Sequence, residues 1–235
     1  MLLVCCTWSV YVGDRLLDAH RAIRSRNLGA LRERHYFHWR HRRLLIPFGC
    51  VAAAVTIVLI VGRMPAAARK DNSVLAAAAL AYFTGVHSTA RLPVWLRRVA
   101  SKEMLVGVLF AAGTIAPTVA RIHFIGWPFL ACFAIFAILA WTNCSAIEGW
   151  ESSRVHSGIA SRATLLGITC ILVSATLASV NWRLSALAAS AATSALLLSL
   201  LDRRRANLSP LTLRALADLV LLTPLAAVLI GANHT

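Results

Sequence analysis

Hydrophobic residues along this chain are grouped into eight long apolar segments, separated by short polar stretches. Most segments are about 17–20 residues long, and a helix that rises about 1.5 Å per residue then crosses a hydrocarbon core of about 30 Å. The pattern therefore predicts an all-α polytopic membrane bundle of about eight transmembrane helices. The segments are residues 2–18, 44–62, 73–89, 103–120, 126–143, 163–180, 183–201 and 211–231.

The polar stretches between the segments carry very unequal numbers of basic residues. If the stretch after the first segment is cytoplasmic, the cytoplasmic stretches carry 19 of the 24 Lys and Arg residues and the opposite stretches carry 5. This imbalance across short loops is the positive-inside pattern of membrane proteins. It predicts that the Arg- and His-rich loop 19–43 is cytoplasmic, and we expect the membrane to be the inner membrane of a bacterium.

Composition excludes a soluble domain. Apolar residues make up 59 % of the chain and charged residues 14 %, and the mean hydropathy is +0.71. The longest polar stretch lies within residues 19–43, so we predict a single integral membrane domain over residues 1–235. The net charge of +15 belongs to loops that meet anionic lipid headgroups, which makes the bilayer the expected partner and argues against nucleic acid.

The first apolar segment is short for a membrane span. Only 13 residues precede Asp14, which corresponds to about 20 Å of helix. We therefore expect the coding region to extend upstream and to encode a further apolar segment of about 20 residues.

Two pairs of carboxylates are the most informative polar features. Asp14 and Asp18 are four residues apart and Glu148 and Glu151 are three apart, so the members of each pair share one helix face. The charge count places both pairs on the cytoplasmic side. Neighbouring carboxylates repel unless a cation lies between them, and Mg²⁺ is commonly held by one or two carboxylates plus phosphate oxygens. The pairs predict a two-metal pyrophosphate clamp around one cavity.

A second interpretation of the first pair needs no metal. Asp14 and Asp18 could instead form ion pairs at the membrane surface with Arg15, Arg21 or His20, which lie within one turn of them. The spacing alone leaves both interpretations open.

At these residues the chain resembles the UbiA superfamily of intramembrane prenyltransferases. Residues 10–18 resemble the family's NDxxDxxxD motif, and residues 146–151 resemble its second acidic motif with a nearby Ile-Glu-Gly. Residues 96–117 resemble the basic loop that leads into a helix containing Gly and Pro. Members of the family have nine helices, so a chain without the first would have eight, in agreement with the charge count.

The resemblance implies a Mg²⁺-dependent transferase that ionises an isoprenoid pyrophosphate and passes the prenyl group to an unknown acceptor. Under this hypothesis the catalytic residues and metal ligands are Asp14, Asp18, Glu148 and Glu151. The substrate-binding residues would be Arg98, Lys102, Arg154 and Asn143.

The first motif departs from the family pattern, because Val10 and Tyr11 stand where the family carries Asn and Asp. One metal-binding carboxylate is therefore absent. The alternatives to a prenyltransferase are a non-catalytic membrane protein of the same fold, whose acids hold ions or support packing, and a small transporter.

Histidines recur every three residues in the basic loop, at His35, His38 and His41. This spacing drifts around a helix rather than pairing ligands at i and i+4. Because Tyr36, Phe37 and Trp39 are interleaved with the histidines, we predict a helix that lies at the membrane interface or caps a substrate. A metal site is the alternative.

The last apolar segment contains one acidic residue, Asp218. Arg214 precedes it by four residues, so an ion pair within one helix is expected. The alternative is a polar contact from Asp218 to the acidic cavity.

Overall fold

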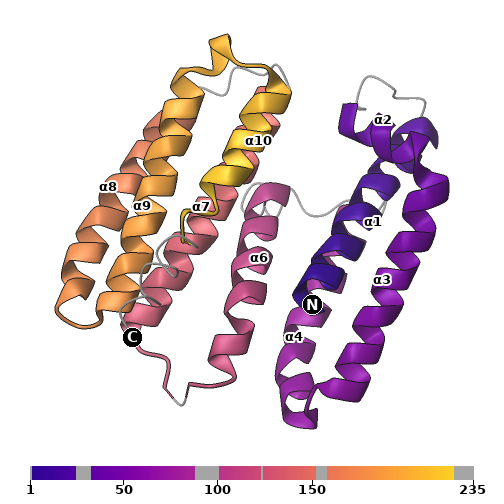
Figure 1. Cartoon of the computed structure of the whole chain (residues 1–235), viewed down its shortest axis with the longest axis horizontal. Helices are drawn as coiled ribbons and strands as arrows, with labels where there is room; N and C mark the ends of the chain where they lie inside the picture. Colours follow the sequence, from indigo (N-terminus) through magenta and orange to yellow (C-terminus); the bar gives the residue numbers. More distant parts are fainter. Residues whose placement is uncertain (1, 25–32, 88–100, 123, 152–157, 225–235) are drawn as a thin grey trace. The chain divides into compact units, whose positions relative to one another are not determined.

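Helices account for all the regular structure in the described part of the chain. The computed structural model describes residues 2–24, 33–87, 101–122, 124–151 and 158–224, and no strand occurs within these ranges. The all-α prediction is therefore confirmed. The helices are α1 (Leu2–Arg24), α2 (Glu33–Arg40), α3 (Arg42–Arg63), α4 (Ala66–His87), α6 (Lys102–Val119), α7 (Trp127–Glu151), α8 (Ile159–Ala178), α9 (Trp182–Arg203), the 3-10 helix η2 (Arg205–Asn207) and α10 (Pro210–Val220) (Figure 1).

Five of the described helices are long and apolar enough to cross a membrane, namely α3, α6, α7, α8 and α9. Large apolar side chains cover their outer surfaces, as at Phe48 (63 % exposed), Val58 (67 %) and Leu165 (66 %). Exposed apolar surface of this extent fits contact with lipid chains rather than with water. The chain is thus an integral membrane protein with five candidate spans, and the predicted number of eight is not confirmed.

The predicted first segment, residues 2–18, corresponds to a longer and more polar helix. Helix α1 continues to Arg24 and carries five charged residues in its second half, which keeps it outside the group of five candidate spans. The predicted loop 19–43 is consequently helical over most of its described part. It contains the last turn of α1, the whole of α2 and the start of α3.

The predicted loop between the second and third segments is also shorter than expected. Helix α4 begins at Ala66, so Arg69 and Lys70 lie in its first turns rather than in a loop. The Arg69 N–H donates to the Pro65 carbonyl oxygen at 3.0 Å and closes the first turn. Three successive alanines after Pro65 favour helix strongly enough to include the charged residues that follow.

Residue contacts divide the chain into two compact units, Met1–Leu92 and Pro93–Thr235. In the first unit α1 packs along α3, and the short helix α2 contacts both. The core of this unit is small and includes Val12 (2 % exposed) and Ala19 (0 %). A Cβ added at Gly49 of α3 would lie 3.7 Å from Val12 Cγ1, so α1 and α3 are in van der Waals contact there. The single membrane domain over residues 1–235 stays a prediction.

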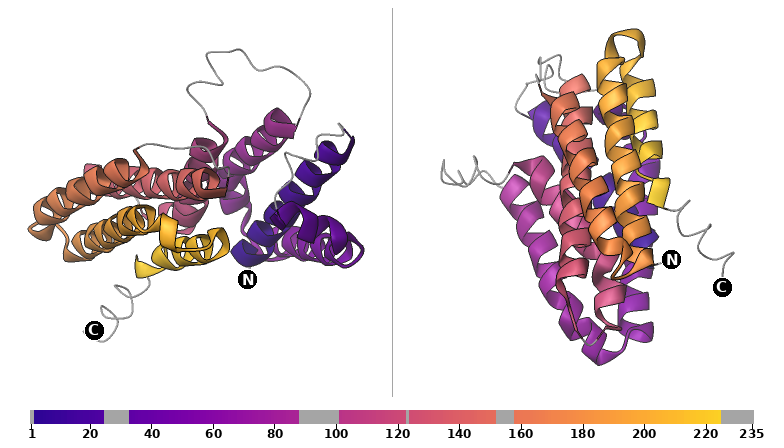
Figure 2. Two further views of the ribbon diagram at one scale, coloured as in Figure 1. Left: turned by 90° about the horizontal axis from the view of Figure 1, so that it is seen from above. Right: turned by 90° about the vertical axis from the view of Figure 1, so that its left-hand side faces the viewer.

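In the second unit α6 packs on α7, and α8 and α9 form a closely packed hairpin (Figure 2). A Cβ at Gly107 of α6 would lie 2.7 Å from the Trp141 backbone nitrogen and 2.9 Å from the Ala137 carbonyl oxygen of α7. Only glycine allows this approach, as is usual where helices pack without a hydrophobic driving force. The buried core includes Leu139 and Leu198, each 1 % exposed.

One end of the second unit collects most of its charge. The starts of α6, α8 and α10 and the ends of α7 and α9 lie toward this end, which we call the polar end (Figure 1). The opposite end carries Arg121 and Arg183. The charge segregation seen in the sequence is therefore preserved by the helix directions. The described basic residues toward the polar end are Lys102, Arg162, Arg203, Arg204, Arg205 and Arg214.

Helix α10 ends at Val220, inside the predicted segment 211–231, and the cause is Pro224. In a continuous helix the N–H of residue 224 would donate to the Val220 carbonyl oxygen, and proline has no N–H. The Ser194 hydroxyl of α9 donates to that carbonyl oxygen instead, at 2.9 Å, and Thr223 Oγ1 donates to the Ser190 carbonyl oxygen at 2.9 Å. The Ser194 hydroxyl of α9 thus replaces the missing backbone bond, and the Thr223 hydroxyl adds a second contact to α9.

Candidate functional site

The last two turns of α7 bring several predicted site residues to the polar end of the second unit. Glu148 and Glu151 lie in the final turn of this helix, and Asn143 lies deeper, at 3 % exposure. Among the described residues, the Asn143 side-chain oxygen has no hydrogen-bond partner. An unmatched buried acceptor costs about 1–3 kcal/mol, so this position is suited to a donor from a ligand.

Glu151 has a basic partner in another helix. Arg214 of α10 places Nη1 3.9 Å from Glu151 Oε1, and both side chains are mostly buried. We predicted an ion pair of Arg214 with Asp218 in the same helix. The Arg214 charge does act on Asp218, and Arg214 in addition reaches across to α7. This contact fixes one of the two acids of the second pair.

Asp202, at the end of α9, is a buried carboxylate that we did not single out from the sequence. Its Oδ1 accepts a hydrogen bond from Trp150 Nε1 at 2.8 Å, and its Oδ2 accepts one from the Ala160 backbone N–H at 3.0 Å. Arg205 Nη1 lies 3.4 Å from Oδ1. One side chain therefore joins the ends of α7 and α9 to the start of α8.

A second contact reinforces the junction of α8 and α9. The Ser199 hydroxyl donates to the Ala160 carbonyl oxygen at 3.0 Å and lies 2.8 Å from the Thr164 hydroxyl. Both backbone groups of Ala160 are thus bonded to α9. These bonds hold the helix ends that surround the acidic turn of α7.

Lys102, a predicted substrate-binding residue, is the first residue of α6 and lies toward the same end. Helix α6 begins there because Ser101 caps it, accepting a hydrogen bond from the Met104 N–H at 3.1 Å. The other two predicted basic contacts, Arg98 and Arg154, lie outside the described residues. Four predicted site residues of the second unit therefore share its polar end: Asn143, Glu148, Glu151 and Lys102.

The first acidic pair lies on α1 in the other unit. Asp14 is 9 % exposed, and the Arg15 guanidinium lies 3.7 Å from its carboxylate. Both Asp14 and Asp18 have further interactions. The Arg15 contact agrees with the ion-pair interpretation for Asp14. Because the two acidic pairs belong to different units, their grouping around one cavity stays a prediction.

Metal-ligating side chains are not gathered into a cluster within the described ranges. No group of three or more His, Cys, Asp or Glu residues is placed there so that it could hold a metal ion. Each acidic pair supplies two carboxylates, which is the usual protein share for Mg²⁺ when substrate phosphate oxygens complete the shell. The donor set of Glu148 and Glu151 thus fits a substrate-dependent Mg²⁺ site, and Mg²⁺ itself stays a prediction.

The described histidines of the basic stretch make separate local contacts. His38 is 7 % exposed and meets the Tyr11 ring of α1 edge-on, with 5.5 Å between ring centroids. His41 Nδ1 lies 2.9 Å from the Phe37 carbonyl oxygen of its own turn. The predicted helix in this stretch is present as α2, and its place at a membrane interface stays a prediction.

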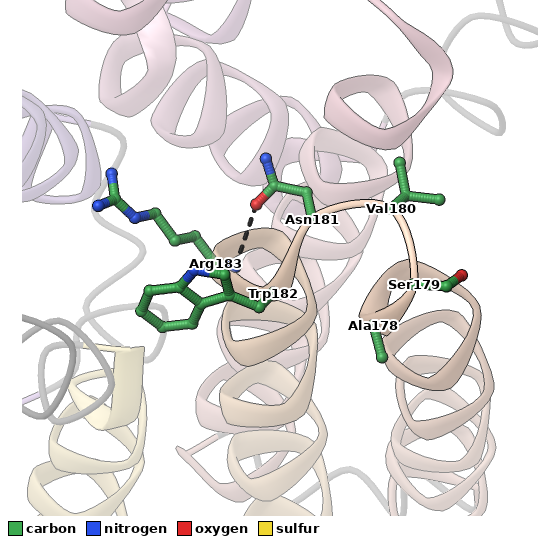
Figure 3. A pocket seen from close by; sticks show the side chains of 6 residues that line it. All are labelled: Ala178, Ser179, Val180, Asn181, Trp182 and Arg183. Atoms are coloured by element: carbon green, nitrogen blue, oxygen red, sulfur yellow. Dashed lines mark hydrogen bonds between the residues drawn. The ribbon is translucent and has the colours of Figure 1, made fainter. Parts of the chain in front are cut away.

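A shallow hollow lies at the opposite end of the second unit, at the turn between α8 and α9 (Figure 3). The Asn181 side chain caps α9 there by accepting hydrogen bonds from the Arg183 and Leu184 N–H groups. Trp182 is 54 % exposed, with the Arg183 guanidinium 5.6 Å from its ring centre. An exposed Trp beside an Arg is typical of a membrane-interface anchor rather than of a catalytic site.

Comparisons with known proteins return no relative of this chain. No protein-family model, no curated protein and no solved structure matches it. The resemblance to UbiA prenyltransferases therefore depends on the short motifs in residues 10–18, 96–117 and 146–151, and it stays a prediction.

Proposed function

We propose that the chain is a membrane-embedded prenyltransferase that binds an isoprenoid pyrophosphate at the polar end of its second unit. The observation that carries this proposal is the unmatched, buried oxygen of Asn143, which lies on the same helix as Glu148 and Glu151. A water molecule of a bound Mg²⁺ shell would donate a hydrogen bond to Asn143 Oδ1 and remove the cost of that unmatched acceptor, since Mg²⁺ usually keeps several of its waters. The apolar helices around it suit a long isoprenoid chain.

The acidic and the basic residues have different proposed roles in binding pyrophosphate. Glu148 and Glu151 would hold Mg²⁺ together with pyrophosphate oxygens, and Asp14 and Asp18 are proposed for the same role in the first unit. The Lys102 ammonium would contact the pyrophosphate directly, and the same role is proposed for the two predicted arginines, Arg98 and Arg154. A bound Mg²⁺ supplies neutralisation of the charge that develops on the leaving pyrophosphate.

The proposed reaction is a substitution at an allylic carbon. The bond between this carbon and the pyrophosphate oxygen breaks, and the leaving pyrophosphate keeps the electron pair. The nucleophilic atom of the acceptor then bonds to the allylic carbon, and its proton passes to the released pyrophosphate. The protein contributes by stabilising the developing negative charge and by excluding water from the cation.

A non-catalytic membrane protein of the same organisation is the second candidate. The ion pair between Glu151 and Arg214 favours it, because a carboxylate held by a guanidinium is a less available metal ligand. In that case the acidic residues of α7 would serve helix packing at the polar end.

An assay that measures pyrophosphate released from allylic pyrophosphates of increasing chain length distinguishes the prenyltransferase from the non-catalytic protein. A prenyltransferase assayed in native membranes together with their extractable small molecules, as the source of the acceptor, should release pyrophosphate with Mg²⁺ and stop when EDTA is added. Glu148→Gln and Glu151→Gln should each lower the rate by about 10- to 100-fold. Asp71→Asn, which removes a carboxylate near the start of α4, is the matched control and should retain the rate. Mg²⁺-dependent binding without release would support the non-catalytic candidate.

A further inference from the structure

We propose that one exposed face at the α2–α3 junction binds the phosphate headgroups of anionic phospholipids. The face is formed by Tyr36, Phe37 and Arg40 of α2 together with Arg43 at the start of α3, and all four are exposed. We call it the headgroup face. The proposal does not depend on prenyl transfer.

Continuity with α3 places the headgroup face at the edge of the hydrocarbon core. Helix α2 ends at Arg40, and after the single residue His41 the candidate span α3 begins at Arg42. Within the first two turns of α3, Leu44 is 62 % exposed and Phe48 is 63 % exposed. The chain therefore changes from basic and aromatic to lipid-exposed apolar within a few residues, as expected at a membrane interface.

Contacts with α1 fix which side of α2 faces outward. His38 is buried against the Tyr11 ring, and Trp39 lies 6.0 Å from the His20 ring. The side of α2 that carries His38 and Trp39 is thus occupied by protein. Two aromatic side chains remain outward, with Tyr36 50 % exposed and Phe37 55 % exposed. Exposed aromatic rings at this level favour the boundary between headgroups and acyl chains.

From Arg34 to Lys70 the charged side chains of the sequence are all basic. No acidic residue occurs in the sequence between Glu33 and Asp71. Arg42, between the arginines of the face, donates to the Trp39 carbonyl oxygen at 2.9 Å and stacks on that ring at 4.5 Å. It thereby braces the junction of α2 and α3. An arginine guanidinium can hold a phosphate with two parallel hydrogen bonds, so the face is complementary to an anionic phosphate.

Native mass spectrometry of the full chain in a neutral detergent tests the assignment. The probes are short-chain phosphatidylglycerol, phosphatidylcholine of the same chain length, and inorganic phosphate as a competitor. Phosphatidylglycerol should bind at least about tenfold more tightly than phosphatidylcholine, since each basic residue near a headgroup contributes roughly a fivefold preference. The double variant Arg40→Gln with Arg43→Gln should weaken phosphatidylglycerol binding by about thirtyfold.

Two further variants make the result specific to the headgroup face. Arg63→Gln with Lys70→Gln removes the same number of exposed charges near the other end of α3 and should leave phosphatidylglycerol affinity unchanged. Phe37→Ser should weaken the binding of both lipids, because it removes an apolar contact rather than a charge. Equal binding of the two lipids would overturn the proposal. An equal loss of phosphatidylglycerol affinity in the two double variants would also overturn it. Complete displacement of the lipid by inorganic phosphate would overturn it as well, because it would indicate a site for a soluble anion.

Discussion

Asp202 accepts hydrogen bonds from donors that lie 52 and 42 residues away in the sequence, on Trp150 and Ala160. Its carboxylate satisfies one backbone N–H in the first turn of α8, a group that a helix cannot satisfy internally. The residue at the start of that helix, Gly158, has φ +111° and offers no side chain for capping. A distant acid therefore performs the capping role.

Replacing Asp202 with alanine should lower the free energy of unfolding by about 3 kcal/mol, because two partly buried donors lose their acceptor. Asp202→Asn should lower the free energy of unfolding by a smaller amount, since the amide oxygen can still accept one of the two hydrogen bonds. Thermal unfolding in detergent measures both effects. If the alanine variant unfolds at the wild-type temperature, the proposed joining role of Asp202 is wrong.

Sequence alone gave little reason to select Asp202. It follows an apolar segment and precedes three arginines, a pattern that equally describes a solvated helix end. What distinguishes Asp202 is that α7 and α8 bury its side chain, and both helices are far away from it in the sequence. Glu148 and Glu151 were selected because their spacing is local, and local spacing is what a sequence displays.

At the scale of helices, the approach of α6 to α7 depends on the missing side chain of Gly107. Substitution Gly107→Ala should lower the free energy of unfolding by about 1–3 kcal/mol, because the new Cβ would meet backbone atoms that cannot move aside. Gly113→Ala, on the same helix, is the matched control. Its Cβ would have open space, so the variant should gain up to about 1 kcal/mol from helix propensity. Thermal unfolding that shifts in the same direction for both variants would contradict this description of the α6–α7 contact.

The break at the end of α10 gives a test by double substitution. Ser194→Ala should lower the free energy of unfolding by about 1 kcal/mol, because the Val220 carbonyl oxygen loses its donor. In a Pro224→Ala background the backbone can supply that donor, so the same substitution should cost less. The difference between the two backgrounds, measured by thermal unfolding, is the coupling energy. No coupling would mean that Ser194 does not replace the missing backbone bond.

Helix prediction from the sequence succeeded where apolar residues were continuous and failed where charge interrupted them. Residues 44–62 and 183–201 fall within α3 and α9 as expected. Arg69 and Lys70 were predicted to lie in a loop, but they follow three alanines whose helix propensity extends α4 over them. Charge marks the limits of a membrane span, and helices continue beyond those limits.

At the scale of the whole molecule, the division of basic residues predicts which helix ends face the cytoplasm. A phosphatase reporter that is active only outside the cytoplasm should be silent when fused after Arg43. The same reporter fused after Arg121 should be active, since that residue belongs to the predicted outer side. Phosphatase activity after Arg43 together with no activity after Arg121 would show that the topology is the reverse of the predicted one.

The candidate site was predictable in part, for a physical reason. Asn143, Glu148, Glu151 and Lys102 reach the same end of the second unit because α6 and α7 are adjacent and run in opposite directions, which follows from their short connection. The partner of Glu151 was not predicted, because the contact with Arg214 depends on how α10 packs against α7. Helix direction can be derived from the order of segments, whereas side-chain pairing between distant helices cannot.

Equilibrium binding of an isoprenoid pyrophosphate tests the central claim most directly. Labelled farnesyl pyrophosphate would be titrated into the purified full chain with Mg²⁺ and again after addition of EDTA. Wild-type protein should bind it saturably only with Mg²⁺, and the double variant Glu148→Gln with Glu151→Gln should bind at least about tenfold more weakly, while Asp71→Asn binds normally. Equal binding by all three proteins, or binding that is insensitive to EDTA, would contradict a Mg²⁺-dependent pyrophosphate site at the end of α7.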